Sequence, residues 1–280
     1  MRTRTRCVVL PKAALLLCVL VVQSSVAAPT QAAELVTIRT NLTIVTHALQ
    51  PPTPTPAAIA SVVLLAGGNG VLDLDPSGKI EKLQGNFLIR SAYRFMQYRL
   101  NVAMLDAPDL TGIRLTEPHA KYVASALAAV RLHWPKQKKV WLVGTSNGTI
   151  SAFSLAARTA SNAVPPIPPF ADAPNGIVLA SPIVQGAGET VWGTTPPVAT
   201  AKLKIPVLVV SHKGDPCTAS DYALSGKFYK TVNSPKKAFV AGTGAMPAAA
   251  QRACDAFSYH GFHGIEETVV KKIADFIGAS

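Results

Sequence analysis

Stretches made almost wholly of apolar residues recur along the sequence and alternate with amphipathic stretches. The apolar runs stand at residues 59–66, 101–105, 139–143, 176–180, 206–210 and 238–241. A strand that is apolar at nearly every position suits a parallel sheet that is covered on both faces. Helical patterns accompany these runs at residues 86–98, 120–133, 148–158, 219–232 and 265–277. The alternation predicts an α/β chain with a mostly parallel central sheet and helices on both faces.

The composition agrees with a folded globular chain. Hydrophobic residues make up 49% of the 280 residues and charged residues only 15%, which excludes an intrinsically disordered chain. The sequence has no internal repeat or long linker, so we expect residues 34–280 to form a single domain without a separate cap domain. The formal net charge is +12. No nucleic-acid-binding motif accompanies that charge, and we expect no nucleic-acid partner.

The N-terminus has the layout of a secretory signal peptide. Basic residues at positions 2–12 precede an apolar run at residues 13–22, and small residues follow. The run is too short to cross a bilayer, which takes about 20 apolar residues. We expect residues 1–33 to be removed by cleavage between about 27 and 33. The mature protein would then be secreted or periplasmic, with no integral membrane span.

One segment carries a chemical signature. Residues 140–149 read as a strand, then Gly-Thr-Ser-Asn-Gly, then a helix. A serine on such a tight strand-to-helix turn presents its hydroxyl above the sheet, so Ser146 is the expected nucleophile. The N–H of Asn147 is expected to face a developing oxyanion. A glycine-rich loop ends an earlier strand, and there Gly68, or else Asn69, is expected to supply the second oxyanion N–H.

Two further residues stand where a serine nucleophile needs them. Asp215 follows a late strand and is the expected acid, because a carboxylate there can orient a histidine and stabilise its imidazolium. His260 lies just before the last helix and is the expected base. His263, three residues on, is the alternative base. The chain order Ser146, Asp215, His260 is the order found in α/β-hydrolases.

Two cysteines lie beyond the signal segment, Cys217 and Cys254. In an exported chain an even pair favours a disulfide, and a reduced buried pair is the alternative. Two lone cysteines without a closely spaced Cys or His make a poor zinc site, so we expect no metal. The chemistry above also requires no cofactor. A bridge between the two would tie the loop of Asp215 to the loop of His260.

Several short segments, taken together, form a combination of motifs that is specific enough to suggest a family. They are residues 66–70 (AGGNG), 85–90 (GNFLIR), 106–108 (DAP), 141–152 (WLVGTSNGTISA), 215–217 (DPC), and Cys254 followed by 260–270 (HGFHGIEETVV). Together they resemble the α/β-hydrolase superfamily, and within it a group of small exported bacterial serine hydrolases. The resemblance implies the α/β-hydrolase fold, with Ser146 as nucleophile, Asp215 as acid and His260 as base. His263 departs from the apolar residue that is usual there.

These features predict an exported serine hydrolase, and most directly a carboxylic ester hydrolase that forms an acyl-enzyme from a small-molecule ester. Two alternatives stay open. One is a non-catalytic binding protein with the same fold, since fold alone does not determine function. The other is an acyltransferase that uses the same residues, because the acyl-enzyme is common to both reactions.

Overall fold

The computed structural model describes residues 34–39, 45–50, 58–75, 79–160, 173–191, 203–244 and 252–280. The expected signal peptide at residues 1–33, with its cleavage window, lies outside these ranges. Residues Ala33–Ser280 form one compact unit. No helix in the described ranges is long and apolar enough to cross a membrane.

An eight-stranded sheet runs through this unit in the strand order β1-β2-β4-β3-β5-β6-β7-β8. The strands are β1 (Glu34–Arg39), β2 (Val45–Gln50), β3 (Ala60–Leu65), β4 (Leu100–Leu105), β5 (Val140–Thr145), β6 (Gly176–Ala180), β7 (Val207–His212) and β8 (Lys237–Gly242). β2 is antiparallel to both of its neighbours, whereas every pairing from β4 to β8 is parallel. The predicted mostly parallel sheet is therefore confirmed.

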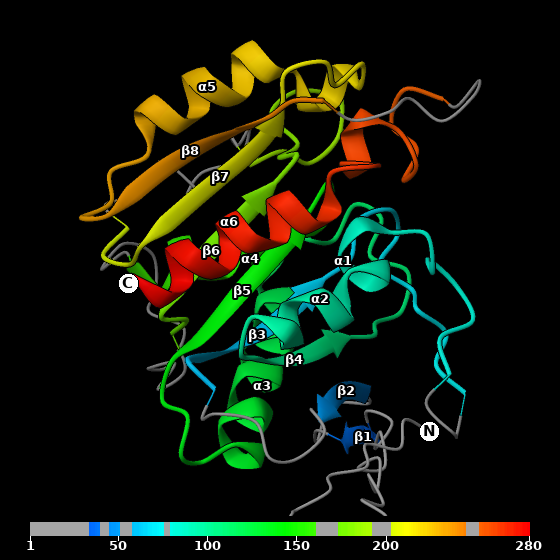
Figure 1. Ribbon diagram of the computed structural model, residues 1–280, viewed down its shortest axis with the longest axis vertical. Coiled ribbons are helices and arrows are strands. Elements are labelled where there is room, and N and C mark those ends of the chain that lie inside the picture. Colours follow the sequence, from blue (N-terminus) through cyan, green and yellow to red (C-terminus); the bar gives the residue numbers. More distant parts are fainter. Residues whose placement is uncertain are drawn as a thin grey trace, which may run out of the picture. The chain divides into compact units, whose positions relative to one another are not determined.

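Helices cover both faces of the sheet (Figure 1). Those on one face are α1 (Phe87–Arg90), α2 (Ala92–Gln97) and α6 (Glu266–Gly278). Those on the other face are α3 (Glu117–His133), α4 (Gly148–Ala160) and α5 (Tyr222–Thr231). Two single turns of 3-10 helix, η1 (Thr218–Ser220) and η2 (Tyr259–Gly261), lie in the connecting loops. Within the described ranges no separate cap domain interrupts this arrangement.

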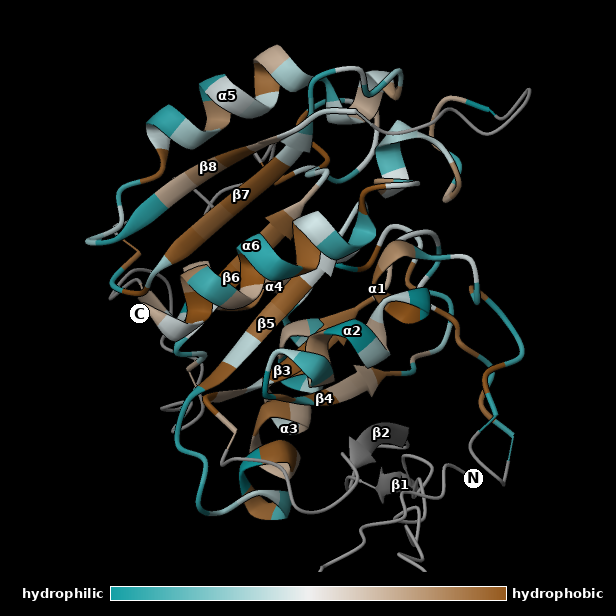
Figure 2. Ribbon diagram, in the orientation of Figure 1, coloured by the Kyte–Doolittle hydropathy of each residue, from teal (hydrophilic) through white to brown (hydrophobic). Residues whose placement is uncertain are grey.

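The central strands are apolar on both sides, as the brown arrows in Figure 2 show. In β5, Trp141 and Val143 pack with the helices of the α1–α2–α6 face, whereas Leu142 packs with those of the opposite face. This is the alternation expected of a strand buried on both faces. On α6, Ile273 and Ile277 are buried against the sheet, as the four-residue spacing of its apolar residues predicts.

Two of the predicted helices differ in more than the position of an end. The helix predicted at residues 86–98 is interrupted at Ser91, whose φ of −100° and ψ of 0° depart from helical values and separate α1 from α2. The helix predicted at residues 219–232 gives way at its start to η1, and α5 begins only at Tyr222. The cause is a cap, because the Asp221 carboxylate accepts a hydrogen bond from the N–H of Leu224 over 2.7 Å.

The strand order places the ends of β3 and β5 side by side. From β3 the chain runs outward to β4, then returns to β5 on the other side of β3. At such a reversal the loops after the two strands diverge and leave a crevice, where open α/β sheets bind ligands. Leu65 at the end of β3 pairs with Gly144 of β5. The loop of Gly68 and the turn of Ser146 therefore start from neighbouring strands.

Candidate active site

Ser146 occupies the turn between β5 and α4. Its φ is +52°, in the left-handed region that a residue with a side chain seldom adopts. The turn is held at both ends, since the Ser146 N–H donates to the Ala180 carbonyl over 3.0 Å and the Thr149 N–H donates to the Ser146 carbonyl over 2.9 Å. Gly148 admits no side chain, because a Cβ there would lie 2.0 Å from the Leu65 carbonyl oxygen. Helix α4 therefore starts directly against the end of β3.

The loop after β3 approaches Ser146 closely. A Cβ on Gly67 would lie 2.8 Å from the Ser146 Cβ. The Gly67 carbonyl accepts from the Gly70 N–H over 3.2 Å, which closes a turn with Gly68 at φ +58°. The Gly68 carbonyl accepts from the Asn147 side-chain amide over 3.0 Å. In the part of the chain that the structure describes, the backbone N–H groups of Gly68 and Asn147 donate to no acceptor, so both are available to a ligand.

Asn69 and Asp106 hold the remainder of this loop. The Asn69 carbonyl accepts from the Leu110 N–H over 2.8 Å, and its side-chain oxygen accepts from the Val71 N–H over 3.2 Å. Asp106 accepts from the Leu72 N–H over 2.8 Å. These bonds anchor the loop at points beyond Gly68. A loop anchored in this way can present donors in a direction that is set before a ligand arrives.

Asp215 and His260 meet beside this loop. The His260 Nδ1 lies 2.9 Å from Asp215 Oδ2, and the side chains are 4% and 0% exposed respectively. The other carboxylate oxygen of Asp215 accepts from the Cys217 N–H over 2.9 Å. His260 is fixed through its backbone, because its N–H donates to the Ser258 hydroxyl and its carbonyl accepts from the Ser181 hydroxyl over 2.7 Å. Its Nε2 has no partner among the described residues.

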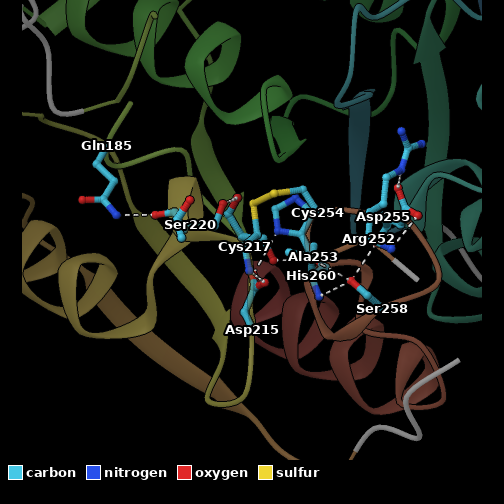
Figure 3. The surroundings of a disulfide bond; sticks show 12 residues. Gln185, Asp215, Cys217, Ser220, Arg252, Ala253, Cys254, Asp255, Ser258 and His260 are labelled. Carbon is cyan, nitrogen blue, oxygen red and sulfur yellow. Dashed lines mark hydrogen bonds and ion pairs between the residues drawn. A yellow bond between two sulfur atoms is a disulfide. The ribbon is translucent and has the colours of Figure 1, made fainter. Parts of the chain in front are cut away.

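A disulfide joins Cys217 to Cys254, as the sequence predicts. The two cysteines are 37 positions apart and their Cα atoms are separated by 4.7 Å. Figure 3 shows the bond beside Asp215 and His260. The bond therefore links the loop after β7, which carries Asp215, to the segment that leads into η2, which carries His260.

Ser146 and His260 line one cavity of about 220 Å³. Gly68 lies in its wall on the β3 side. Two segments complete the walls, namely residues 83 and 85–87 and residues 254–256. The structure thus places the expected nucleophile, base and one oxyanion donor around a shared space, with Asp215 behind the histidine.

The other histidines near this region have different surroundings. His263 is partly exposed and its Nδ1 lies 3.5 Å from a Glu266 carboxylate oxygen. His212 accepts from the Gly214 N–H at Nδ1 over 3.0 Å and stacks on the Tyr259 ring, while burial lowers its pKa. Neither histidine lines the cavity of Ser146. No cluster of three or more His, Cys, Asp or Glu side chains in the described ranges could hold a metal ion.

No protein-family model and no curated protein matches this sequence, but solved structures do. An α/β serine hydrolase homologue from Coxiella burnetii is 14% identical, with a TM-score of 0.56 over 87% of this chain and 97% of that one. An α/β serine hydrolase without a lid from Xanthomonas campestris is 12% identical, with a TM-score of 0.52 over 87% and 95%. A butyrate-bound esterase from Thermogutta terrifontis is 14% identical, with a TM-score of 0.56 over 88% and 93%. The chain has the α/β-hydrolase fold.

The segment at residues 83–87 contributes to a wall of the site, and this was not predicted from the sequence. It includes Leu83, whose φ of +54° has no local sign in the sequence. Arg90 ties this wall to the turn of His260, because its guanidinium donates to the Gly261 carbonyl over 2.6 Å and to Glu266 over 2.9 Å. The first of these bonds joins residues 171 positions apart. The one sequence signal for this segment is the motif at residues 85–90, which is part of the resemblance to α/β-hydrolases.

Removal of the disulfide tests how much the bond contributes to the stability of the fold. Replacing both cysteines, Cys217→Ala with Cys254→Ala, is expected to lower the free energy of unfolding by about 4 kcal/mol, because the bond closes a 37-residue loop. Urea unfolding followed by circular dichroism gives the value. The unsubstituted protein in reductant is the control and should match the double variant. Equal stability of the oxidised protein and the double variant would contradict the prediction.

A buried histidine on α3 predicts a pH dependence of stability. Burial, and secondarily the charge of Arg114, lower the pKa of His119 from 6.5 to about 4. The unfolded chain therefore takes up this proton at a higher pH than the folded chain. Stability should be full above pH 6.5 and should fall by about 3 kcal/mol as the pH drops from about 6.5 to 4.

The variant His119→Gln removes this titration. Urea unfolding of the variant should show a shallower loss of stability than the unsubstituted protein over the same pH range. Carboxylates titrate in both proteins, so the difference between the two curves isolates the histidine. Identical slopes would show that the pKa of His119 is not lowered by folding.

Proposed function

We propose that this chain is an exported carboxylic ester hydrolase that acts through Ser146, Asp215 and His260. The observation that carries the proposal is the setting of His260. Its Nδ1 contacts the buried Asp215 carboxylate, its Nε2 has no partner among the described residues, and the cavity it lines also contains Ser146. An imidazole oriented in this way is suited to take a proton at Nε2.

In the proposed reaction the Ser146 oxygen attacks the acyl carbon while its proton passes to His260 Nε2. The carbonyl oxygen becomes an oxyanion and accepts hydrogen bonds from the backbone N–H groups of Gly68 and Asn147. The negative charge of Asp215 stabilises the imidazolium. As the acyl C–O bond breaks, His260 returns its proton to the leaving alcohol. Water then attacks the acyl-enzyme by the same steps, releasing the carboxylic acid and restoring Ser146.

Several further observations support this proposal. The structural neighbours include proteins named as esterases and serine hydrolases. The cavity of about 220 Å³ that Ser146 and His260 line has room for a small ligand. The Cys217–Cys254 bond and the layout of the N-terminus both favour export, because disulfides persist in oxidising compartments.

The substitution Ser146→Ala tests the proposed nucleophile. Hydrolysis of p-nitrophenyl acetate is expected to fall by about 10⁴-fold or more, while circular dichroism shows a folded protein. The matched control is Ser154→Ala, which removes a buried hydroxyl from the same helix α4 and should retain the activity.

Each outcome separates the proposal from an alternative. Full activity in Ser146→Ala would reject Ser146 as the nucleophile. An unsubstituted protein that hydrolyses no member of a panel of short- and long-chain esters would instead favour a non-catalytic binding protein. New ester formed from an added alcohol, at the expense of free acid, would favour acyl transfer.

A further inference from the structure

A buried arginine lies behind the loop that carries Gly68. Arg114 belongs to the connection between β4 and α3 and is only 2% exposed. Its Nη2 donates to the Gly68 carbonyl over 3.1 Å and reaches the Ala66 carbonyl over 3.4 Å. Its Nη1 donates to the Ser151 hydroxyl on α4 over 2.8 Å. One guanidinium thus joins the loop after β3 to the helix that follows Ser146.

The arginine is held in place from its backbone side. The Glu189 carboxylate accepts from the N–H groups of Arg114 and Leu115 over 2.9 and 2.6 Å. Glu189 therefore binds the backbone rather than the guanidinium. Throughout the described ranges no carboxylate forms an ion pair with the guanidinium, whose partners are two carbonyls and a hydroxyl. A buried cation without a paired anion is costly and calls for a reason.

The positive charge persists at neutral pH. Burial lowers the pKa of Arg114 to about 10, and the nearby charges of Glu189 and Asp109, which form no ion pair with the guanidinium, limit that decrease. His119, whose Nε2 is 2.8 Å from the Ser151 hydroxyl, is neutral because its pKa is lowered to about 4. Ser151 accepts from Arg114 and can donate to His119 Nε2. The other ring nitrogen of His119, Nδ1, is buried and has no hydrogen-bond partner among the described residues. A full positive charge thus remains close behind the Gly68 peptide.

The Gly68 carbonyl is also held from its other side. The Asn147 side chain donates to the same oxygen over 3.0 Å. Gly68 has a positive φ of +58°. Because glycine has no side chain to restrict its backbone, contacts with other residues must fix the orientation of its peptide groups. Its carbonyl anchors and the Gly67–Gly70 turn set the direction of its N–H.

We propose that Arg114 is the positioning residue of the oxyanion hole. It holds the Ala66 and Gly68 carbonyls, which belong to the peptide groups on either side of the Gly67–Gly68 peptide, and so keeps the Gly68 N–H facing the cavity of Ser146. Its buried charge favours the anionic tetrahedral intermediate over the neutral ester. This inference rests on the proposed ester hydrolysis, but it assigns a role to a residue that touches neither substrate nor reacting atoms. Donors aimed at developing charge from a low-dielectric site act mainly on the transition state.

The test separates transition-state stabilisation from simple structural support. In Arg114→Gln the kcat for p-nitrophenyl acetate should fall by about 10- to 100-fold with KM changed less than about twofold. The affinity for phenylboronic acid, which forms a tetrahedral anionic adduct with a serine, should fall by a similar factor. Arg114→Lys, which keeps the charge but not the fork, should lose less. A purely structural role would lower the melting temperature and leave kcat and the boronate affinity unchanged.

The matched control is Arg158→Gln. Arg158 donates to the Leu115 carbonyl over 2.6 Å, so it braces the same connection without touching Ala66 or Gly68. This variant should keep kcat and boronate affinity within about twofold of the unsubstituted protein. An equal loss in Arg158→Gln and Arg114→Gln would overturn the inference. It would show that kcat depends on stabilising the connection between β4 and α3 in general, and not on the contacts of Arg114 with the loop of Gly68.

A second variant covers the case in which Arg114→Gln does not fold. Ser151→Ala removes the Nη1 hydrogen bond of Arg114, together with the contact to His119, and leaves the bonds of Nη2 to the loop. It should lower kcat and boronate affinity together, by a smaller factor. Unchanged values in Ser151→Ala would then overturn the inference, as unchanged values in a folded Arg114→Gln would. If the unsubstituted protein itself neither hydrolyses esters nor binds the boronate, the proposed function fails and this inference fails with it.

Discussion

The packing of the start of α4 against the end of β3 is the constraint on which the site depends. A Cβ on Gly148 would lie 2.0 Å from the Leu65 carbonyl oxygen, so the helix can begin there only with glycine. That contact sets Ser146 at the tip of a strained turn and brings Gly67 beside it. The strain is maintained by a sheet that is buried on both faces and leaves the turn no room to relax.

Much of the fold could be predicted because its signals are local. Wholly apolar runs locate the parallel strands within a few residues, since both faces of each strand are covered. The predicted run at residues 139–143 corresponds to β5 at Val140–Thr145, and the run at residues 59–66 corresponds to β3 at Ala60–Leu65. The turn of Ser146 is predicted by its local Gly-Thr-Ser-Asn-Gly pattern. The Cys217–Cys254 disulfide is predicted by the even number of cysteines beyond the signal segment. The helix boundaries at Ser91 and Asp221 depend on single backbone and capping geometries that apolar spacing does not record.

The remaining parts of the site could not be predicted because they arise from distant contacts. An arginine in a connecting loop is usually solvated, and nothing beside Arg114 indicates that its guanidinium reaches the Ala66 and Gly68 carbonyls. The wall at Leu83 likewise depends on a left-handed backbone at a residue that seldom adopts one. The choice between His260 and His263 needed three dimensions, since only His260 contacts Asp215.

Covalent labelling tests the central claim most directly. The mature protein is treated with a fluorophosphonate, which reacts with activated serines, and the modified peptide is identified by mass spectrometry. The account predicts one adduct, on Ser146, that is lost in Ser146→Ala and is strongly slowed in His260→Gln but not in His263→Gln. An unlabelled protein, or an adduct on another serine, would contradict the claim that the turn after β5 carries the nucleophile.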